Sequence, residues 1–144
     1  MEVLPSYKNG FVCGKENPMG LKIEVFRDKN IVRAEFIPGV NHQGYKGIVH
    51  GGIIFSVMDE VMSRAAMISK GILTLTVEVR IKYRKKARIG KKILFSAKMT
   101  KDLGKVIETE GKAFSEDGKC LAEAKGKFFE IPKKMEEKIV KYFN

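Results

Sequence analysis

The sequence predicts an α+β fold in which a curved antiparallel sheet wraps around one central helix. Three observations support this prediction. Only one long apolar segment with helical periodicity occurs in the first two thirds of the 144-residue chain. Segments with the alternating, β-branched pattern of strands precede and follow it. The last of these segments are separated by short turns, as in an antiparallel meander. One helix and one sheet must share a core, so we expect residues 1–144 to form a single domain.

A strand hairpin is predicted before the helix. Residues 1–20 are rich in glycine, proline and asparagine, which is typical of irregular structure. Residues 21–26 alternate apolar with charged side chains, and a turn at residues 28–30 separates them from a second extended segment, 31–37. We therefore predict strands over 21–26 and 31–37, followed by a glycine-containing loop over 39–52.

The central helix is predicted from Ile53 to about Lys70, with Gly71 at the position where a helix C-terminus favours glycine. At about 100° per residue, Asp59 falls on the flank of the apolar stripe and Glu60 on the opposite side. Asp59 is therefore the acid that we expect to be half-buried. The apolar stripe consists of Ile54, Val57, Met58, Val61, Met62, Ala65 and Ala66.

Two glycines, Gly51 and Gly52, precede this helix directly. A helix N-terminus offers unpaired backbone N–H groups and a partial positive charge, and glycine lets a substrate oxygen approach them closely. An acid beside such a site can act as a base or a nucleophile. The stretch therefore predicts a chemical site as well as a turn, although close packing of the turn would also explain the glycines.

The remainder of the chain predicts strands and one terminal helix. Residues 73–83 are β-branched and alternate with period two, and a basic run follows them. Further strands are indicated at 92–100, 106–115 and 120–130, with short hairpin turns between the last three. After Pro132, an apolar stripe predicts the terminal helix. The stripe consists of Met135, Ile139, Val140 and Phe143.

Composition limits the classes of protein to consider. The chain is 44% hydrophobic and 31% charged, and no apolar run approaches the roughly 20 residues that span a bilayer. Without a secretory leader pattern at the start, we expect a cytoplasmic protein that does not bind membranes. The net charge of +11 favours an anionic partner, although ion-pair networks also give lysine-rich surfaces. The basic residues are dispersed and no nucleic-acid motif occurs, so we expect no nucleic acid.

The two cysteines, Cys13 and Cys120, have no partners at metal-ligand spacing. We expect reduced, structural thiols and no metal site.

Several motifs together resemble the hotdog-fold acyl-CoA thioesterases, specifically the branch typified by the phenylacetate-pathway thioesterases. The resemblance covers nearly the whole chain. The residues that carry it are Cys13-Gly14-Lys15-Glu16-Asn17-Pro18-Met19-Gly20-Leu21, Gln43 to Gly52, Asp59, Thr76 with Tyr83, Asp117-Gly118-Lys119 and Ala122-Glu123-Ala124.

This resemblance implies an activity, the hydrolysis of an acyl-CoA thioester to a free acid and coenzyme A. It implies that the Gly51 N–H binds the thioester oxygen, that Asp59 acts as general base or nucleophile, and that Thr76 holds the attacking water. The implied substrate-binding residues are Gln43, His50, Gly52, Arg84, Lys85 and Lys86. Acid and oxyanion donor come from different subunits in this family, so a homodimer is implied, often paired into a homotetramer. No cofactor is expected beyond the coenzyme A of the substrate.

The sequence departs from the family pattern in three places. Gly10 stands where relatives carry a second cysteine, and Gln43 or Gly44 where many carry asparagine. The segment Lys85-Lys86-Ala87 lacks a common proline and adds charge where relatives bind the phosphates of coenzyme A. The surrounding basic residues are either phosphate ligands or a solvated rim. They are Arg84, Lys85, Lys86, Arg88, Lys91 and Lys92.

Three other functions remain as alternatives to hydrolysis. A non-catalytic acyl-CoA binder or sensor could use the same fold. A hotdog hydratase would need a His/Asp or His/Glu dyad at another spacing than His42 or His50 provide. A nucleic-acid binder would rest on charge alone.

Overall fold

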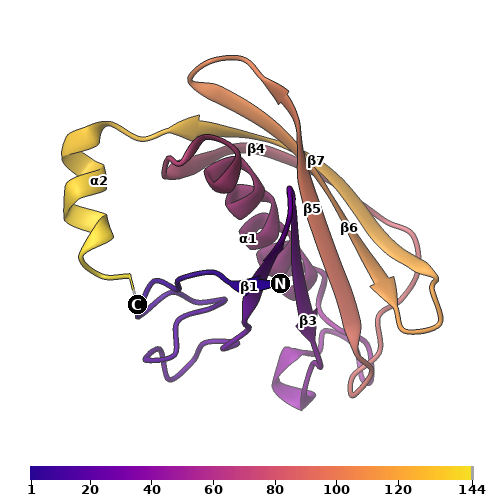
Figure 1. Cartoon of the computed structure of the whole chain (residues 1–144). Coiled ribbons are helices and arrows are strands. Elements are labelled where there is room, and N and C mark those ends of the chain that lie inside the picture. Colours follow the sequence, from indigo (N-terminus) through magenta and orange to yellow (C-terminus); the bar gives the residue numbers. More distant parts are fainter. Residues whose placement is uncertain (144) are drawn as a thin grey trace.

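The computed structural model describes residues 1–143, which form one antiparallel sheet curved around a long helix (Figure 1). The strand order is β1-β2-β3-β5-β6-β7-β4. This arrangement confirms the predicted α+β class. The elements are β1 (Glu2–Val3), β2 (Val25–Asp28), β3 (Ile31–Phe36), a 3₁₀ helix (Val40–His42), α1 (Gly51–Lys70), β4 (Thr74–Tyr83), β5 (Ile93–Asp102), β6 (Val106–Ser115), β7 (Cys120–Glu130) and α2 (Lys133–Val140).

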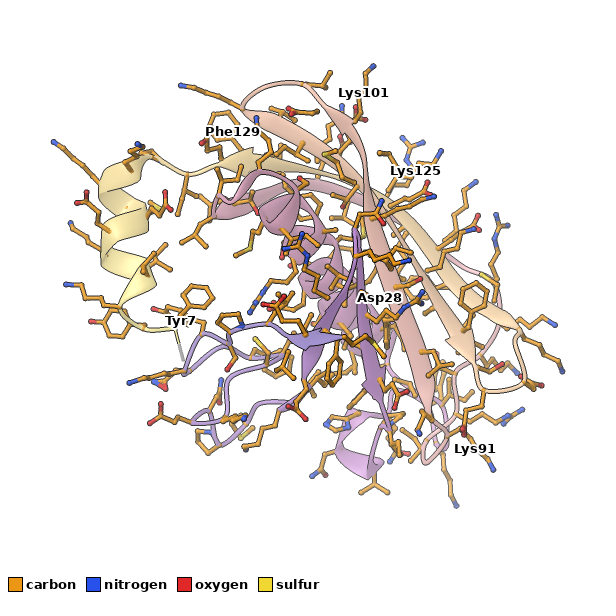
Figure 2. The ribbon with its side chains drawn as sticks, viewed as in Figure 1. Tyr7, Asp28, Lys91, Lys101, Lys125 and Phe129 are labelled. Atoms are coloured by element: carbon orange, nitrogen blue, oxygen red, sulfur yellow. The ribbon has the colours of Figure 1, made fainter. Side chains whose placement is uncertain are left out.

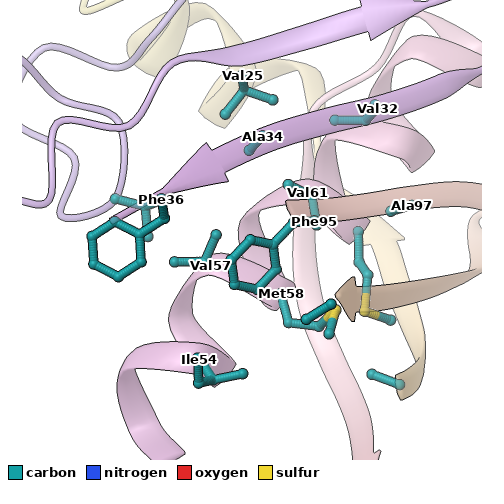
Figure 3. Packing of buried hydrophobic residues seen from close by; sticks show 14 of the residues in the cluster. Val25, Val32, Ala34, Phe36, Ile54, Val57, Met58, Val61, Phe95 and Ala97 are labelled. Carbon is teal, nitrogen blue, oxygen red and sulfur yellow. The ribbon is translucent and has the colours of Figure 1, made fainter. Parts of the chain in front are cut away.

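Helix α1 packs its apolar stripe against the concave face of the sheet. Figure 3 shows Phe95 of β5 lying against Val57 and Met58 of α1, and all three side chains are buried. Gly111 on β6 allows this close approach, because a Cβ there would lie 2.6 Å from the Met58 sulfur. The helix is therefore held at a fixed depth in the sheet, which sets the position of every side chain that it presents.

Both ends of α1 are capped. The helix begins two residues before the predicted start because the His50 ring caps it, accepting a hydrogen bond from the Gly52 N–H. At the other end, Gly71 takes the left-handed conformation (φ 66°) and its N–H donates to the Met67 carbonyl at 2.7 Å. The predicted glycine C-terminus is confirmed.

The meander β5-β6-β7 follows the sequence prediction closely. β6 and β7 have the predicted bounds, and β5 runs two residues beyond the predicted end. Gly104 and Gly118 take positive φ angles of 92° and 85° in the two connecting turns. β4, which follows α1 in the chain, crosses to the far edge of the sheet and pairs only with β7 among the described strands.

The first predicted strand is displaced in the structure. The alternating segment 21–26 predicted a strand there, but the ladder with β3 starts at Val25. Lys22 has φ 54°, which interrupts an extended chain, and the N–H groups on both sides of it donate to the carbonyls of residues 11 and 12. The N-terminal loop thus takes the hydrogen bonds that a longer strand would need. Residues 2–3, predicted as irregular, form β1 beside β2.

Helix α2 lies outside the core. It begins after Pro132 as predicted, stands apart from the sheet (Figure 1), and has no buried residue. The chain then returns to the N-terminal loop, where the rings of Phe143 and Tyr7 meet edge to face at 5.6 Å. Within residues 1–143, no helix has the length and apolar character needed to cross a membrane.

Candidate active site

The N-terminus of α1 presents one free backbone donor. His50 Nδ1 accepts the Gly52 N–H at 2.8 Å, and the N–H groups of Ile53 and Ile54 donate to the His50 carbonyl. Among the described residues, the Gly51 N–H has no hydrogen-bond acceptor. A free N–H at the positive end of a helix is suited to bind an oxygen that carries developing negative charge.

Tyr83 at the end of β4 holds the same turn from the other side. Its hydroxyl donates to the Gly51 carbonyl at 2.8 Å, and its ring covers the Gly51 Cα so closely that a Cβ there would lie 3.4 Å from it. Burial raises the pKa of the Tyr83 phenol, so the hydroxyl keeps its proton at neutral pH. In the sequence, Tyr83 stands out only as part of a motif, and no contact could be predicted for it.

Gln43 organises the loop that leads into His50. Its side-chain carbonyl accepts the Gly47 N–H at 3.1 Å, and residue 43 forms a bridge with Val49. Gly47 turns the loop with φ 78°. The Gln43 carbonyl is therefore occupied within the loop, so its contribution to the site is to shape the approach to His50.

Asp59 and Thr76 form the second part of the candidate site. The Thr76 hydroxyl donates to Asp59 Oδ1 at 2.7 Å, across the gap from β4 to α1. Burial raises the pKa of the Asp59 carboxyl, the Thr76 hydrogen bond lowers it, and the Glu60 charge raises it. The net effect is an increase. An acid with a raised pKa that keeps one oxygen free is suited to take a proton from water or to attack a carbonyl.

A β-bulge makes both β4 contacts possible. Thr76 and Tyr83 are seven residues apart, and side chains at an odd separation face opposite sides of a regular strand. Here the register with β7 shifts between Thr76 and Glu78, which leaves Val77 as an extra residue. Thr76 and Tyr83 therefore both face α1, where they contact Asp59 and Gly51. The sequence pattern contains no signal that located this bulge.

Glu60 has a different role from Asp59. Its carboxylate accepts the Arg64 Nε–H at 3.1 Å and the Cys13 thiol at 3.2 Å, on the side of α1 that faces the N-terminal loop. Burial is the main cause that raises the pKa of Cys13 to about 11, so this residue is a thiol at neutral pH. Helical phase correctly placed the two acids on different sides of α1, but the prediction that only Asp59 is half-buried is wrong, because Glu60 is also half-buried beneath the N-terminal loop.

A cavity of about 1040 Å³ opens beside Gly51 and Tyr83. Its wall includes the apolar residues Ile54 and Leu121 and many of the basic residues between β4 and β5. Figure 2 shows Lys91 at this end of the sheet, opposite the end that carries Lys101. The cavity does not include Asp59 or Thr76 in its lining.

The basic residues around the cavity fall into two groups. Arg84 pairs with Glu123 at 2.6 Å, Lys92 with Glu35 at 3.5 Å and Lys119 with Asp117 at 3.6 Å. Within the described part of the chain, the others have no acidic partner: Lys85, Lys86, Arg88 and Lys91. Of the three basic residues predicted to bind substrate, Lys85 and Lys86 are free for an anion, whereas Arg84 is engaged.

The two parts of the candidate site are far apart within one chain. Gly51 and Asp59 are eight residues apart on α1, which is about 12 Å along a helix axis. The Gly51 N–H and the Asp59 carboxylate therefore cannot meet at one carbonyl group of a ligand bound to a single chain. The structure brings Gly51, His50 and Tyr83 together, and separately Asp59 and Thr76.

The chain is similar to a known protein family. The profile described as "Thioesterase superfamily" matches residues 46–122. A curated relative from Archaeoglobus fulgidus, "Putative esterase", is 31% identical over 99 residues, which cover 69% of this chain and 64% of the relative. The chain thus spans less than two thirds of that relative's length.

Three solved structures show the same fold. A crystal structure of a thioesterase superfamily protein superposes with a TM-score of 0.77 at 22% identity, covering 85% of this chain and 61% of that one. The PaaI protein of the E. coli phenylacetic acid degradation operon gives 0.72 at 18% identity, covering 78% and 81%. A Streptococcus mutans protein bound to acetyl CoA gives 0.69 at 22% identity, covering 76% and 88%.

Proposed function

The chain belongs to the thioesterase superfamily, and from this premise we propose that it hydrolyses an acyl-CoA thioester to a free carboxylic acid and coenzyme A. The observation that carries the proposal is the free Gly51 N–H at the mouth of a cavity with unpaired basic residues. A fold relative, the Streptococcus mutans protein, is bound to acetyl CoA, a ligand of this chemical class.

The thioester carbonyl would sit at the N-terminus of α1. The Gly51 N–H donates to the carbonyl oxygen, and this hydrogen bond strengthens as negative charge develops on the oxygen during attack. The phosphate groups of coenzyme A bind the basic residues that have no acidic partner, because no ion pair has to break first. These residues are Lys85, Lys86, Arg88 and Lys91. Arg84 stays with Glu123 in this account.

Asp59 would supply the base or the nucleophile. Thr76 occupies Oδ1, which leaves Oδ2 to face the reacting group. In the first route, Asp59 takes a proton from water while the water oxygen attacks the carbonyl carbon, the C–S bond breaks and the thiolate leaves. In the second, Asp59 attacks the carbon itself, the C–S bond breaks and the thiolate leaves; water then hydrolyses the resulting anhydride to the free acid and the Asp59 carboxylate. Both routes need the ionised carboxylate.

The proposed site needs two copies of the chain. Because Gly51 and Asp59 lie about 12 Å apart on one helix, a site that uses both combines Gly51 of one copy with Asp59 of another. β4 is suited to join the copies, since it is a ten-residue edge strand with exposed apolar side chains such as Leu75 and Val77. We propose a homodimer joined along β4; pairing of dimers into a homotetramer stays a prediction.

Turnover of acyl-CoA tests the proposed function directly. Purified protein, given acyl-CoAs of different length and aromatic character with a thiol reagent, should release free thiol. Asp59→Asn should lower kcat by roughly 10³-fold or more, because the base or nucleophile is lost. Glu60→Gln is the matched control: it removes the charge of the adjacent acid, which contacts Arg64 and Cys13. Loss of the Arg64 ion pair lowers its stability, so it is assayed below its unfolding midpoint, where kcat should stay within about threefold.

Two results would contradict the proposal. The first is no thiol release from any acyl-CoA by wild-type protein that binds coenzyme A, a result that would favour the non-catalytic binder. The second is equal turnover by wild type and Asp59→Asn, which would remove Asp59 from the chemistry.

A further inference from the structure

The peptide group between Gly51 and Gly52 is anchored at both of its polar atoms. Its carbonyl oxygen accepts the Tyr83 hydroxyl at 2.8 Å, and its N–H donates to His50 Nδ1 at 2.8 Å. One anchor comes from β4 and the other from the residue that caps α1. The orientation of this peptide is therefore set by two side chains from separate parts of the fold.

This anchoring acts on the neighbouring peptide, which carries the Gly51 N–H. Glycine has wide backbone freedom, and two glycines in succession at a helix end have little intrinsic preference for one geometry. The cap bond alone fixes one end of the Gly51–Gly52 peptide. The Tyr83 hydroxyl fixes the other end. The His50–Gly51 peptide is also held at its own carbonyl by the N–H groups of Ile53 and Ile54, so Tyr83 adds a second restraint on the rotation about the Gly51 Cα that would redirect the Gly51 N–H.

The position of Tyr83 is not explained by core packing. Its side chain is 51% exposed, and it lies among basic residues on the cavity wall rather than in the apolar core. The β-bulge at Val77 is needed to turn Tyr83 and Thr76 to the same side of β4. β4 thus contributes to both parts of the proposed site: Thr76 contacts Asp59, and Tyr83 contacts the turn that carries the Gly51 N–H.

We propose that Tyr83 is a positioning residue for thioester hydrolysis, holding the Gly51 N–H in the direction that the thioester oxygen requires. The inference rests on the proposed function. It assigns Tyr83 an effect on the rate of the chemical step, exerted through the Gly51 carbonyl and without contact to the reacting atoms. Loss of the hydroxyl should misdirect the donor by a small angle, which lowers transition-state stabilisation more than ground-state binding.

Tyr83→Phe is the variant that tests this inference, because it keeps the ring over Gly51 and removes only the hydroxyl. We expect kcat to fall roughly 10- to 100-fold, with KM changed less than about threefold. This fall in kcat is smaller than the one caused by removing an oxyanion donor entirely. Tyr142→Phe is the control: it is the same substitution at a side chain that is also 51% exposed, next to Tyr7 in the C-terminal segment. It should leave both constants unchanged.

A second readout follows the backbone without relying on turnover. In isotope-labelled protein, Tyr83→Phe should shift the carbonyl carbon resonance of Gly51 and the amide resonance of Gly52, whereas Tyr142→Phe should shift neither. If Tyr83→Phe unfolds near the assay temperature, both measurements are made below its unfolding midpoint, where the same losses are expected.

The outcomes separate this inference from the proposed function. Active wild type with unchanged kcat in Tyr83→Phe would overturn the role of Tyr83 and leave acyl-CoA hydrolysis intact. A rise in KM at constant kcat would also overturn it, since it would make Tyr83 a substrate contact. Wild type without turnover on any acyl-CoA would overturn the proposed function, and this inference with it.

Discussion

Asp59 combines two opposing influences at a single carboxyl group. Burial raises its pKa, while the hydrogen bond from Thr76 lowers it. In the proposed mechanism the carboxylate is the active form, so kcat/KM should rise with pH through the pKa of Asp59. The midpoint of this rise should lie above about pH 3.9, which is the usual pKa of an exposed aspartate.

Thr76→Val should move this rise to higher pH. The substitution removes the hydrogen bond that favours the ionised form, so the pKa of Asp59 increases further and less carboxylate is present at a given acidic pH. Thr76→Ser keeps the hydroxyl and serves as the control, with a profile close to that of wild type. The measurement is kcat/KM against pH for all three proteins. A rise that stays in place, or moves to lower pH, in Thr76→Val would contradict this role of Thr76.

For single residues, the sequence indicated which side chains belong to the candidate site better than it indicated which partners they contact. Helical phase was sufficient to separate Asp59 from Glu60, because each side chain on a regular helix has a fixed direction. Tyr83 could not be assigned in the same way. Its direction depends on the bulge at Val77, and seven residues of regular strand would have turned it away from Thr76. Likewise, pairing of Arg84 with Glu123 depends on which strands are neighbours.

Among the elements, α1 is fastened to the N-terminal loop by Arg64. This guanidinium is 5% exposed and donates to the Glu60 carboxylate, the Cys13 sulfur and the Pro5 carbonyl. It also lies 5.6 Å from the centre of the Phe143 ring. One side chain therefore connects the central helix to both terminal segments of the chain.

Arg64→Met should destabilise the protein strongly. It leaves the partly buried Glu60 carboxylate without its counter-charge and the Pro5 carbonyl without its donor, and a buried pair broken in this way costs about 3 kcal/mol or more. Arg33→Met is the control. Arg33 makes a similar bond to Asp28 at 3.2 Å, but both side chains are at least 40% exposed, so its loss should cost about 1 kcal/mol or less. Urea unfolding measures both free energies, and equal losses would contradict the account.

The elements that the sequence located best are those whose ends are marked by local turn chemistry. β6 lies between turns with Gly104 and Gly118, both in the conformation that favours glycine, and β7 begins directly after the second turn. The strand predicted over 21–26 had such a mark only at its end, in the turn at residues 28–30. Its alternation was compatible with a strand, but backbone hydrogen bonds to residues 11 and 12 replace the ladder there, and these bonds join segments that the pattern treats separately.

In the whole molecule, the two parts of the candidate site lie at different positions along α1. The free Gly51 N–H and the basic cavity lie at the helix start, and Asp59 lies more than two turns further on. Within a single chain, two groups this far apart cannot act on the same carbonyl group of a ligand. The separation becomes useful when a second copy, joined along the β4 edge, brings its own helix alongside.

Mixed dimers test this central claim most directly. Asp59→Asn removes the acid, and Gly51→Pro removes the N–H. Proline is well suited to the first position of a helix, and the residue before it, His50, already has the extended backbone that proline requires (ψ 133°). Gly51→Ala, which keeps the N–H, is the control for the added side-chain atoms and should retain most activity.

Each single variant alone should be nearly inactive. When Asp59→Asn and Gly51→Pro chains are combined by co-expression, half of the dimers are mixed, and one of the two sites in each mixed dimer has an intact Asp59 and an intact Gly51. The mixture should therefore recover about a quarter of wild-type activity. No recovery in a preparation shown to contain mixed dimers would contradict it, because each site would then draw both groups from the same chain.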